Sequence, residues 1–176
     1  MSWRIVAASA AGTSHTATGG ECQDSCFASI ESASDKDSLL YMFVADGAGS
    51  AMRGGKGAEL AIEVAAEFFT KQYFLPEFTL HEALAIDCML MIRRAIDDHT
   101  EKEGLRARDY ACTFLGLLSF SQSTLVMQIG DGGVVIDIGD GFHVPIEPMS
   151  REYANMTYFA TDNASLYTQI SPPPTH

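Results

Sequence analysis

Basic residues are scarce in this sequence. The chain has 176 residues, of which 11 are lysine or arginine and 23 are aspartate or glutamate, so its formal net charge is −12. Proteins that bind nucleic acid without sequence preference need a basic face to neutralise the phosphates. The charge balance therefore argues against nucleic-acid binding. The length of the chain predicts a single domain.

Long hydrophobic runs are also missing. No stretch approaches the roughly 18 consecutive apolar residues that a membrane-spanning helix needs. The first residues, MSWRIVAASAAG, hold one arginine and only a short apolar run. A cleaved signal peptide would need a longer hydrophobic block. We therefore expect a cytoplasmic protein with no membrane partner.

Cysteine is infrequent and widely spaced. The four cysteines are Cys22, Cys26, Cys88 and Cys112. A structural zinc site needs close pairs in both halves of a sequence, and only the first two cysteines lie near each other. We expect reduced thiols with structural roles, as is usual in the cytosol.

The first half of the sequence has the patterns of short strands and two long helices. Strands are predicted at residues 3–10, 25–31 and 39–45. The last of them is apolar almost throughout, which is typical of a buried central strand. An amphipathic helix is predicted at 57–73, with Leu60, Val64 and Phe68 on its buried face.

A second helix is predicted to begin at Thr79. The tetrapeptide Thr-Leu-His-Glu at 79–82 has the pattern of a capping box, in which Thr79 is the N-cap. Gly104 is expected to end this helix as a left-handed cap.

The second half of the sequence is rich in strands. They are predicted at residues 112–120, 124–129, 133–138 and 142–146. The intervening Ser-Gln-Ser, Gly-Asp-Gly-Gly and Gly-Asp-Gly are typical of hairpin turns. Strands, two long helices and further strands predict an α+β fold. The final SPPPTH, residues 171–176, is expected to be a loose tail.

The stretch YMFVADGAGSAMRGGKGAELA, residues 41–61, runs from a strand through a glycine-rich loop into a helix. A phosphate-binding loop has this context, but its motif fails here. Ser50 stands where the first glycine belongs, and Lys56 is followed by Gly57 rather than serine or threonine. Asp46, at the end of the strand, either forms a tight turn or supplies an oxygen ligand to a hard cation.

Other acids stand at the ends of predicted strands. Asp24 comes just before the strand at 25–31, and Asp131 follows the strand at 124–129. Asp131 also fits a hairpin turn, and we interpret Asp140 only as a turn residue. Several carboxylates at strand ends favour the cation interpretation of Asp46.

Four segments carry a resemblance to a known family. They are GTSH…CQDS, VADGAGS…GGKGAELA, ACTFLG and QIGDGG. Their order and approximate spacing are similar to those of the metal-dependent protein phosphatases of type 2C, and most similar to a bacterial branch. The resemblance extends from about Trp3 to Asp162. It implies a two-sheet β-sandwich flanked by helices, in one domain at residues 1–170, with metals at one end of the sheets.

The resemblance also implies a chemistry and a set of site residues. Two divalent cations, Mg²⁺ or Mn²⁺, would share a bridging water that attacks a phosphoserine or phosphothreonine. Asp46 would bridge both ions and the carbonyl of Gly47 would contact one of them. Asp24, with Gln23 beside it, would lie near the second ion. Asp131 matches the acid of a Gly-Asp-Ser-Arg segment that is associated with an accessory third ion.

Two departures from the family pattern stand out. Many members have an arginine before the first acid to bind the phosphate, and here His15 stands nearest that place. A histidine is a weaker, pH-dependent anion ligand, and His15 is otherwise a polar loop residue. Arg53 and Lys56 are alternative sources of positive charge.

The second departure concerns the remaining metal acids of the family, which are expected beyond the last residue of this chain. Asp162-Asn163 does not match the terminal Asp-Asn pair, because no apolar strand follows it directly. We therefore expect a C-terminally short domain. Uncovered sheet edges and apolar surface would then favour self-association.

The main hypothesis is a metal-dependent protein serine/threonine phosphatase, whose partners are a phosphorylated protein and the opposing kinase. One alternative is a catalytically inactive family member that acts as a binding module. Another is an α+β domain in which the Asp-Gly pairs are only turns.

Overall fold

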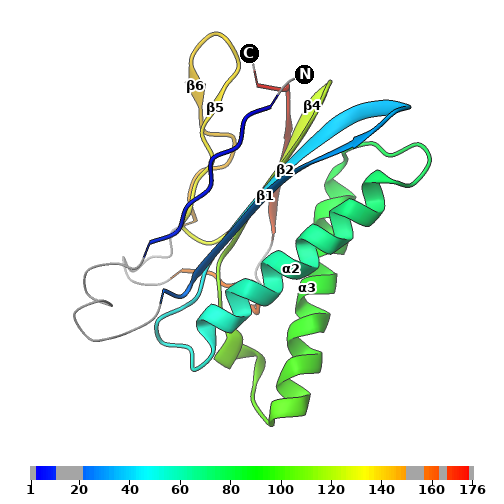
Figure 1. Cartoon of the computed structure of the whole chain (residues 1–176). Coiled ribbons are helices and arrows are strands. Elements are labelled where there is room, and N and C mark those ends of the chain that lie inside the picture. The colour runs from blue at the N-terminus through cyan, green and yellow to red at the C-terminus, as the bar shows by residue number, and fades with distance from the viewer. Residues whose placement is uncertain (1–2, 11–21, 150–156, 163–165, 175–176) are drawn as a thin grey trace.

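An antiparallel sheet with two helices on one face forms the body of the protein. The computed structural model describes residues 3–10, 22–149, 157–162 and 166–174. The main sheet has five strands in the order β1-β2-β3-β4-β7, and β5 and β6 form a second sheet. Helices α2 and α3 cover one face of the main sheet, while β5, β6 and residues 3–10 lie on its other side (Figure 1). The predicted α+β class is confirmed.

The elements have the following bounds. The strands are β1 (Asp24–Ala33), β2 (Lys36–Asp46), β3 (Phe114–Phe120), β4 (Ser123–Ile129), β5 (Ile136–Asp137), β6 (Phe142–His143) and β7 (Tyr167–Ser171). The helices are α2 (Gly54–Tyr73), α3 (Glu82–Glu103) and the short 3₁₀ helix η1 (Ala107–Tyr110). The strands predicted at 25–31, 39–45, 112–120 and 124–129 correspond to β1 to β4.

Strand β2 is central, as its apolar sequence predicted. Leu39 and Phe43 point toward the helices and are fully buried. Leu40 and Met42 point to the opposite face, where they pack with Trp3 and the second sheet. Because both faces of β2 are covered, its side chains are apolar on both sides rather than alternating with polar ones.

Small side chains set α2 close to the sheet. Ala58, Ala61 and Ala65 are each 0% exposed, and Phe69 stacks on Phe43 of β2 with ring centroids 5.7 Å apart. Alanine permits this close approach because it has only a Cβ to bury. Among the described residues, no helix combines the length and the apolarity needed to cross a lipid bilayer.

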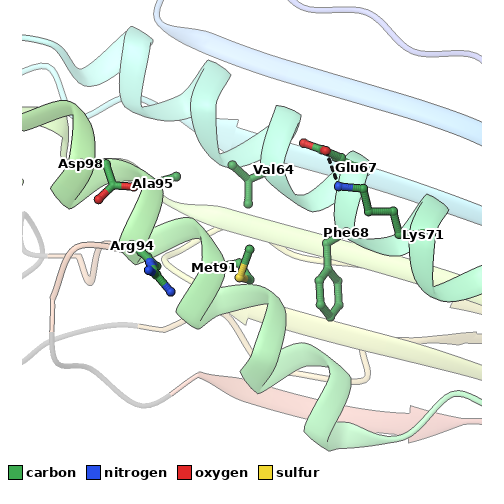
Figure 2. Close-up of a pocket in the computed structure, with 8 residues that line it drawn as sticks. All are labelled: Val64, Glu67, Phe68, Lys71, Met91, Arg94, Ala95 and Asp98. Atoms are coloured by element: carbon green, nitrogen blue, oxygen red, sulfur yellow. Dashed lines mark hydrogen bonds and ion pairs between the residues drawn. The ribbon is translucent and has the colours of Figure 1, made fainter.

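The predicted buried face of α2 is only partly right. Leu60 is buried, but Val64 and Phe68 are half-buried and line a groove between α2 and α3 (Figure 2). A second helix thus takes up the apolar side chains that do not face the sheet. The helix also begins at Gly54 rather than at residue 57.

The predicted capping box at Thr79 is wrong. Helix α3 begins at Glu82, and its N-cap is His81, which has extended backbone and no side-chain capping hydrogen bond. Phe78 and Leu80 pack against the main core, and this alternation holds the preceding segment extended. The predicted end is confirmed, because Gly104 is the C-cap with φ of 68°.

Three further strand predictions need correction. Residues 3–10 form no strand, because Trp3 and Ile5 pack onto the face of the main sheet rather than pairing with its edge. The predicted strands at 133–138 and 142–146 shrink to the two-residue β5 and β6. Strand β7 was not predicted because its sequence is not apolar, and it pairs with β4 at the sheet edge.

Candidate metal centre

Asp24 and Asp46 face each other across the end of the β1–β2 hairpin. They are direct register partners of the two antiparallel strands, so their side chains lie on the same face of the sheet. That face is the one opposite the helices, and both residues are exposed there. Like charges directly opposite each other are destabilising in a sheet unless a cation lies between them. This pair is therefore the candidate metal centre.

A cleft beside Asp24 forms one half of the site. It has a volume of about 270 Å³ and is lined by both acids and by Cys26 of β1. Residues 8–10 of the N-terminal segment also line it. We call it the first cleft.

A second cleft lies across Asp46, on the side of strands β3 and β4. Its volume is about 280 Å³, and Asp46, Thr113 and Asp131 line it. Asp46 therefore borders both clefts, whereas Asp24 borders only the first and Asp131 only the second. Among the described residues, no three histidine, cysteine, aspartate or glutamate side chains are close enough to form a metal-binding group.

The backbone of Asp46 is fixed by Thr113, the residue before β3. The Asp46 amide donates a hydrogen bond to Oγ1 of Thr113 at 3.0 Å, and the Thr113 amide donates to the Asp46 carbonyl at 2.8 Å. On the other side, the Gly47 amide donates to the Gln23 carbonyl at 3.1 Å. These backbone hydrogen bonds fix Asp46 and Gly47 between the starts of β1 and β3.

The glycines of the loop serve close packing. A Cβ on Gly47 would lie 2.3 Å from the carbonyl carbon of Gly54, and one on Gly57 would lie 2.0 Å from the carbonyl oxygen of Tyr110. No real Cβ comes so close to backbone atoms. Glycine is therefore required where the first turn of α2 meets the end of β2 and η1.

The cationic side chains of the loop are engaged elsewhere. Arg53 Nε lies 3.7 Å from a carboxylate oxygen of Glu103, and Lys56 Nζ lies 3.0 Å from one of Glu59. The hydrogen bond to Glu59, together with its charge, raises the pKa of Lys56. His15, the other residue predicted to bind phosphate, lies outside the described residues.

Two other acids of the sequence have turn roles. Asp162 Oδ2 accepts a hydrogen bond from the Phe159 amide at 3.2 Å, and the Asp162 carbonyl accepts one from Arg93. Asp140 Oδ1 lies 2.6 Å from Nε2 of His143, within the β5–β6 connection. Neither acid borders the two clefts.

Sequence reasoning missed Thr113 and Gln128. Gln128 borders the second cleft, is fully buried, and donates from Nε2 to the carbonyls of Gly130 and Glu147, both at 3.4 Å. Its Oε1 has no hydrogen-bond partner among the described residues. A glutamine inside the apolar run LVMQIG was the available signal, because a buried amide needs partners.

Cys112 lies next to the site but does not take part in it as a thiolate. Burial, with a smaller contribution from the charge of Asp46, raises the pKa of Cys112 to about 12. A thiol must lose its proton to bind a metal or attack a substrate. Cys112 is therefore a core residue, as expected from the sequence.

Comparison with known proteins identifies the family. The model of the protein phosphatase 2C family matches residues 11–172. The chain belongs to this family. It is 49% identical over 162 residues to serine/threonine-protein phosphatase 3 of Escherichia coli (strain K12), a match that covers 92% of this chain and 64% of that relative. The chain thus spans less than two thirds of the relative's length.

Two solved structures have the same fold. The serine/threonine phosphatase Stp1 from Staphylococcus aureus aligns with a TM-score of 0.64 at 14% identity, over 86% of this chain and 66% of that one. RsbX, solved in complex with magnesium, aligns with a TM-score of 0.55 at 15% identity, over 88% of this chain and 62% of that one. At such low identities these matches support the fold of the type-2C phosphatase family.

Proposed function

We propose that this chain is the metal-binding part of a protein serine/threonine phosphatase. The observation that carries the proposal is the cross-strand pair Asp24 and Asp46 at the junction of two clefts. Family membership and the 49% identical phosphatase support it. The substrate would be a protein that carries phosphoserine or phosphothreonine, and an opposing kinase would supply it.

The donor set fits Mg²⁺ or Mn²⁺. Both are hard cations that bind carboxylate and carbonyl oxygens and keep several waters, so one or two carboxylates suffice to hold an ion. Asp24 and Asp46 would hold the ion in the first cleft, with the Gly47 carbonyl as a further ligand. Asp46 and Asp131 face the second cleft and would hold a cation there. When bound, such cations supply a nucleophilic water at neutral pH and neutralise charge on the phosphoryl group.

The residues around the cations have positioning roles. Thr113 keeps Asp46 in register through the two hydrogen bonds described above. Asp24, Asp46 and Asp131 are all exposed, so a phosphorylated side chain on a protein surface can reach these acids. His15 stays a predicted phosphate ligand.

Hydrolysis of a phosphothreonine peptide in the presence of Mn²⁺ tests the proposal. Asp46→Asn should lower turnover by about 100-fold or more, since it removes a ligand common to both cation sites. Asp140→Asn is the matched control, because Asp140 is an acid of a Gly-Asp-Gly turn outside both clefts, and this variant should retain activity.

An inactive binding module is the second candidate. The observation that favours it is that the described residues hold no group of three metal-binding side chains. Calorimetric titration with Mn²⁺ separates the two. Asp46-dependent binding without turnover supports the binding module, whereas the absence of any Mn²⁺ binding would mean that Asp24 and Asp46 are only turn residues.

A further inference from the structure

A stripe of large apolar side chains lies on the solvent side of helix α3. Ile86, Leu90 and Met91 are 53%, 56% and 49% exposed. Ile86 and Leu90 are four residues apart and lie on the same face of the helix, and Met91 is exposed on the neighbouring part of the helix surface. We call these three side chains the α3 stripe. Exposed apolar surfaces of this kind mark sites of interaction.

A groove between α2 and α3 runs beside the α3 stripe. Its volume is about 290 Å³, and its floor is made by the apolar Val64, Phe68, Met91 and Ala95. Figure 2 shows these side chains together with the charged residues at the rim. On one rim Lys71 and Glu67 pair with each other at 2.5 Å. Met91 belongs to both the groove and the stripe, so the two form one apolar surface.

Two opposite charges flank the α3 stripe at equal distances. Asp87 and Arg94 are both exposed, and each lies about one helical turn from the midpoint between Leu90 and Met91. Within the part of the chain that the structure describes, neither side chain has an ion pair. Along α3 the order is therefore negative charge, apolar centre, positive charge. A second α3 that runs in the opposite direction presents a positive charge to each negative one.

We propose that the α3 stripe packs against the same stripe of a second copy of this chain. The two α3 helices would run antiparallel about a twofold axis near Leu90 and Met91. In a twofold interface, every contact between two different residues occurs twice, once in each direction. Asp87 of each copy therefore lies opposite Arg94 of the other, and Leu90 packs on the apolar centre of the second copy.

The ends of α3 favour the antiparallel arrangement over a parallel one. The C-terminal half of the helix carries exposed acids, including Asp97, Asp98 and Glu101. In the antiparallel pair these acids lie near the first turn of the other α3, which holds one acid, Glu82, at the positive end of the helix dipole. A parallel pair would place the acids of the two copies next to each other.

Sedimentation equilibrium over a wide range of protein concentration tests the proposal, with charge reversals as the decisive variants. The wild-type chain should form dimers that Leu90→Asp dissociates. Asp87→Arg alone, or Arg94→Asp alone, should weaken dimerisation by about tenfold, because each puts like charges in two places of the twofold interface. The double variant D87R/R94D should restore it. Asp35→Arg, a charge reversal on the exposed β1–β2 turn, is the control and should leave the dimer unchanged.

Three results would overturn the proposal. A wild-type chain that stays monomeric at every concentration would show that the α3 stripe does not bind a second copy. A dimer that persists in Leu90→Asp would use another surface, such as a sheet edge. Failure of D87R/R94D to recover the affinity lost in the single variants would exclude the antiparallel pairing. Circular dichroism of each variant separates loss of association from loss of folding.

Discussion

Gly57 of helix α2 and Tyr110 of η1 approach each other more closely than any residue with a side chain would allow. A Cβ placed on Gly57 would lie 2.0 Å from the Tyr110 carbonyl oxygen, which belongs to rigid backbone. Gly57→Ala should therefore push α2 away from η1 and destabilise the fold by about 1–3 kcal/mol, as overpacking does. Urea denaturation measures this change.

Gly49→Ala is the matched control for that experiment. Nothing lies within 4 Å of a Cβ on Gly49, so its unfolding free energy should change by less than about 0.5 kcal/mol. Equal effects of the two substitutions would contradict the packing role of Gly57.

The acid pair should make stability depend on divalent cations. Without metal, Asp24→Asn removes a like charge directly opposite Asp46, so the melting temperature should rise slightly. With saturating Mn²⁺, the wild type should gain stability, because an ion that binds only the folded state raises the melting temperature. The variant should gain less.

Thermal melts with and without MnCl₂ measure both effects. Asp35→Asn, which changes an exposed acid of the β1–β2 turn, should respond to Mn²⁺ as the wild type does. A wild type whose melting temperature is indifferent to Mn²⁺ would count against a cation between the two acids.

Buried thiols should make the protein sensitive to alkali. Burial raises the pKa of Cys112 from 9.0 to about 12 and raises that of Cys88 as well. Below pH 9 these thiols are protonated in both the folded and the unfolded state, so they add no pH dependence. Above pH 9 only the unfolded state ionises, and stability should fall by up to about 1.4 kcal/mol per pH unit for each thiol.

Urea midpoints measured from neutral pH to about pH 10.5 check this slope, which should be smaller in Cys112→Ala. Alkylation of the native protein gives an independent test. Cys22 is exposed and should react, whereas Cys88 and Cys112 should react only after unfolding. Rapid labelling of Cys112 in the folded protein would show that this thiol is accessible to solvent rather than buried.

Lys36 should stabilise the end of helix α2. Its Nζ donates to the carbonyls of Tyr73 at 2.8 Å and Leu75 at 3.2 Å, and lies 5.2 Å from the centre of the Tyr73 ring. Lys36→Met removes a cation from a helix C-terminus and leaves these carbonyls without that donor. We expect a loss of about 1–2 kcal/mol in urea denaturation.

Lys71→Met serves as the comparison for Lys36. Lys71 is exposed and forms a surface ion pair with Glu67 of the same helix, which should contribute about 0.5 kcal/mol or less. A larger effect at Lys71 than at Lys36 would contradict the capping role.

Local patterns predicted most of the fold. The apolar run at 39–45 marked the central strand, and Gly104 marked the end of α3, because both signals depend on the residues themselves. The capping box at Thr79 failed because tertiary packing of Phe78 and Leu80 outweighs a local capping preference. Strand β7 escaped prediction because its pairing with β4, rather than its own composition, makes it a strand.

The sequence predicted the acids of the candidate site but not the residues that surround and position them. Asp24 and Asp46 stood out as carboxylates at strand ends, and the structure places them opposite each other. Thr113 carries no local signal, and the only signal for Gln128 is an amide within an apolar run. Their proximity to Asp46 arises only when β3 and β4 join the sheet. Asp131, which follows β4, also reaches the cleft beside Asp46 only because β4 joins the sheet.

The link between Asp46 and Thr113 spans 67 residues of sequence, whereas the Asp24–Asp46 hairpin is local. Local contacts form faster than distant ones, and synthesis delivers the N-terminal part first. As the chain leaves the ribosome, Asp24 and Asp46 can therefore pair before Thr113, which fixes the backbone of Asp46, has been synthesised. Cation affinity, followed along a series of nascent chains of increasing length, would then increase in two separate steps.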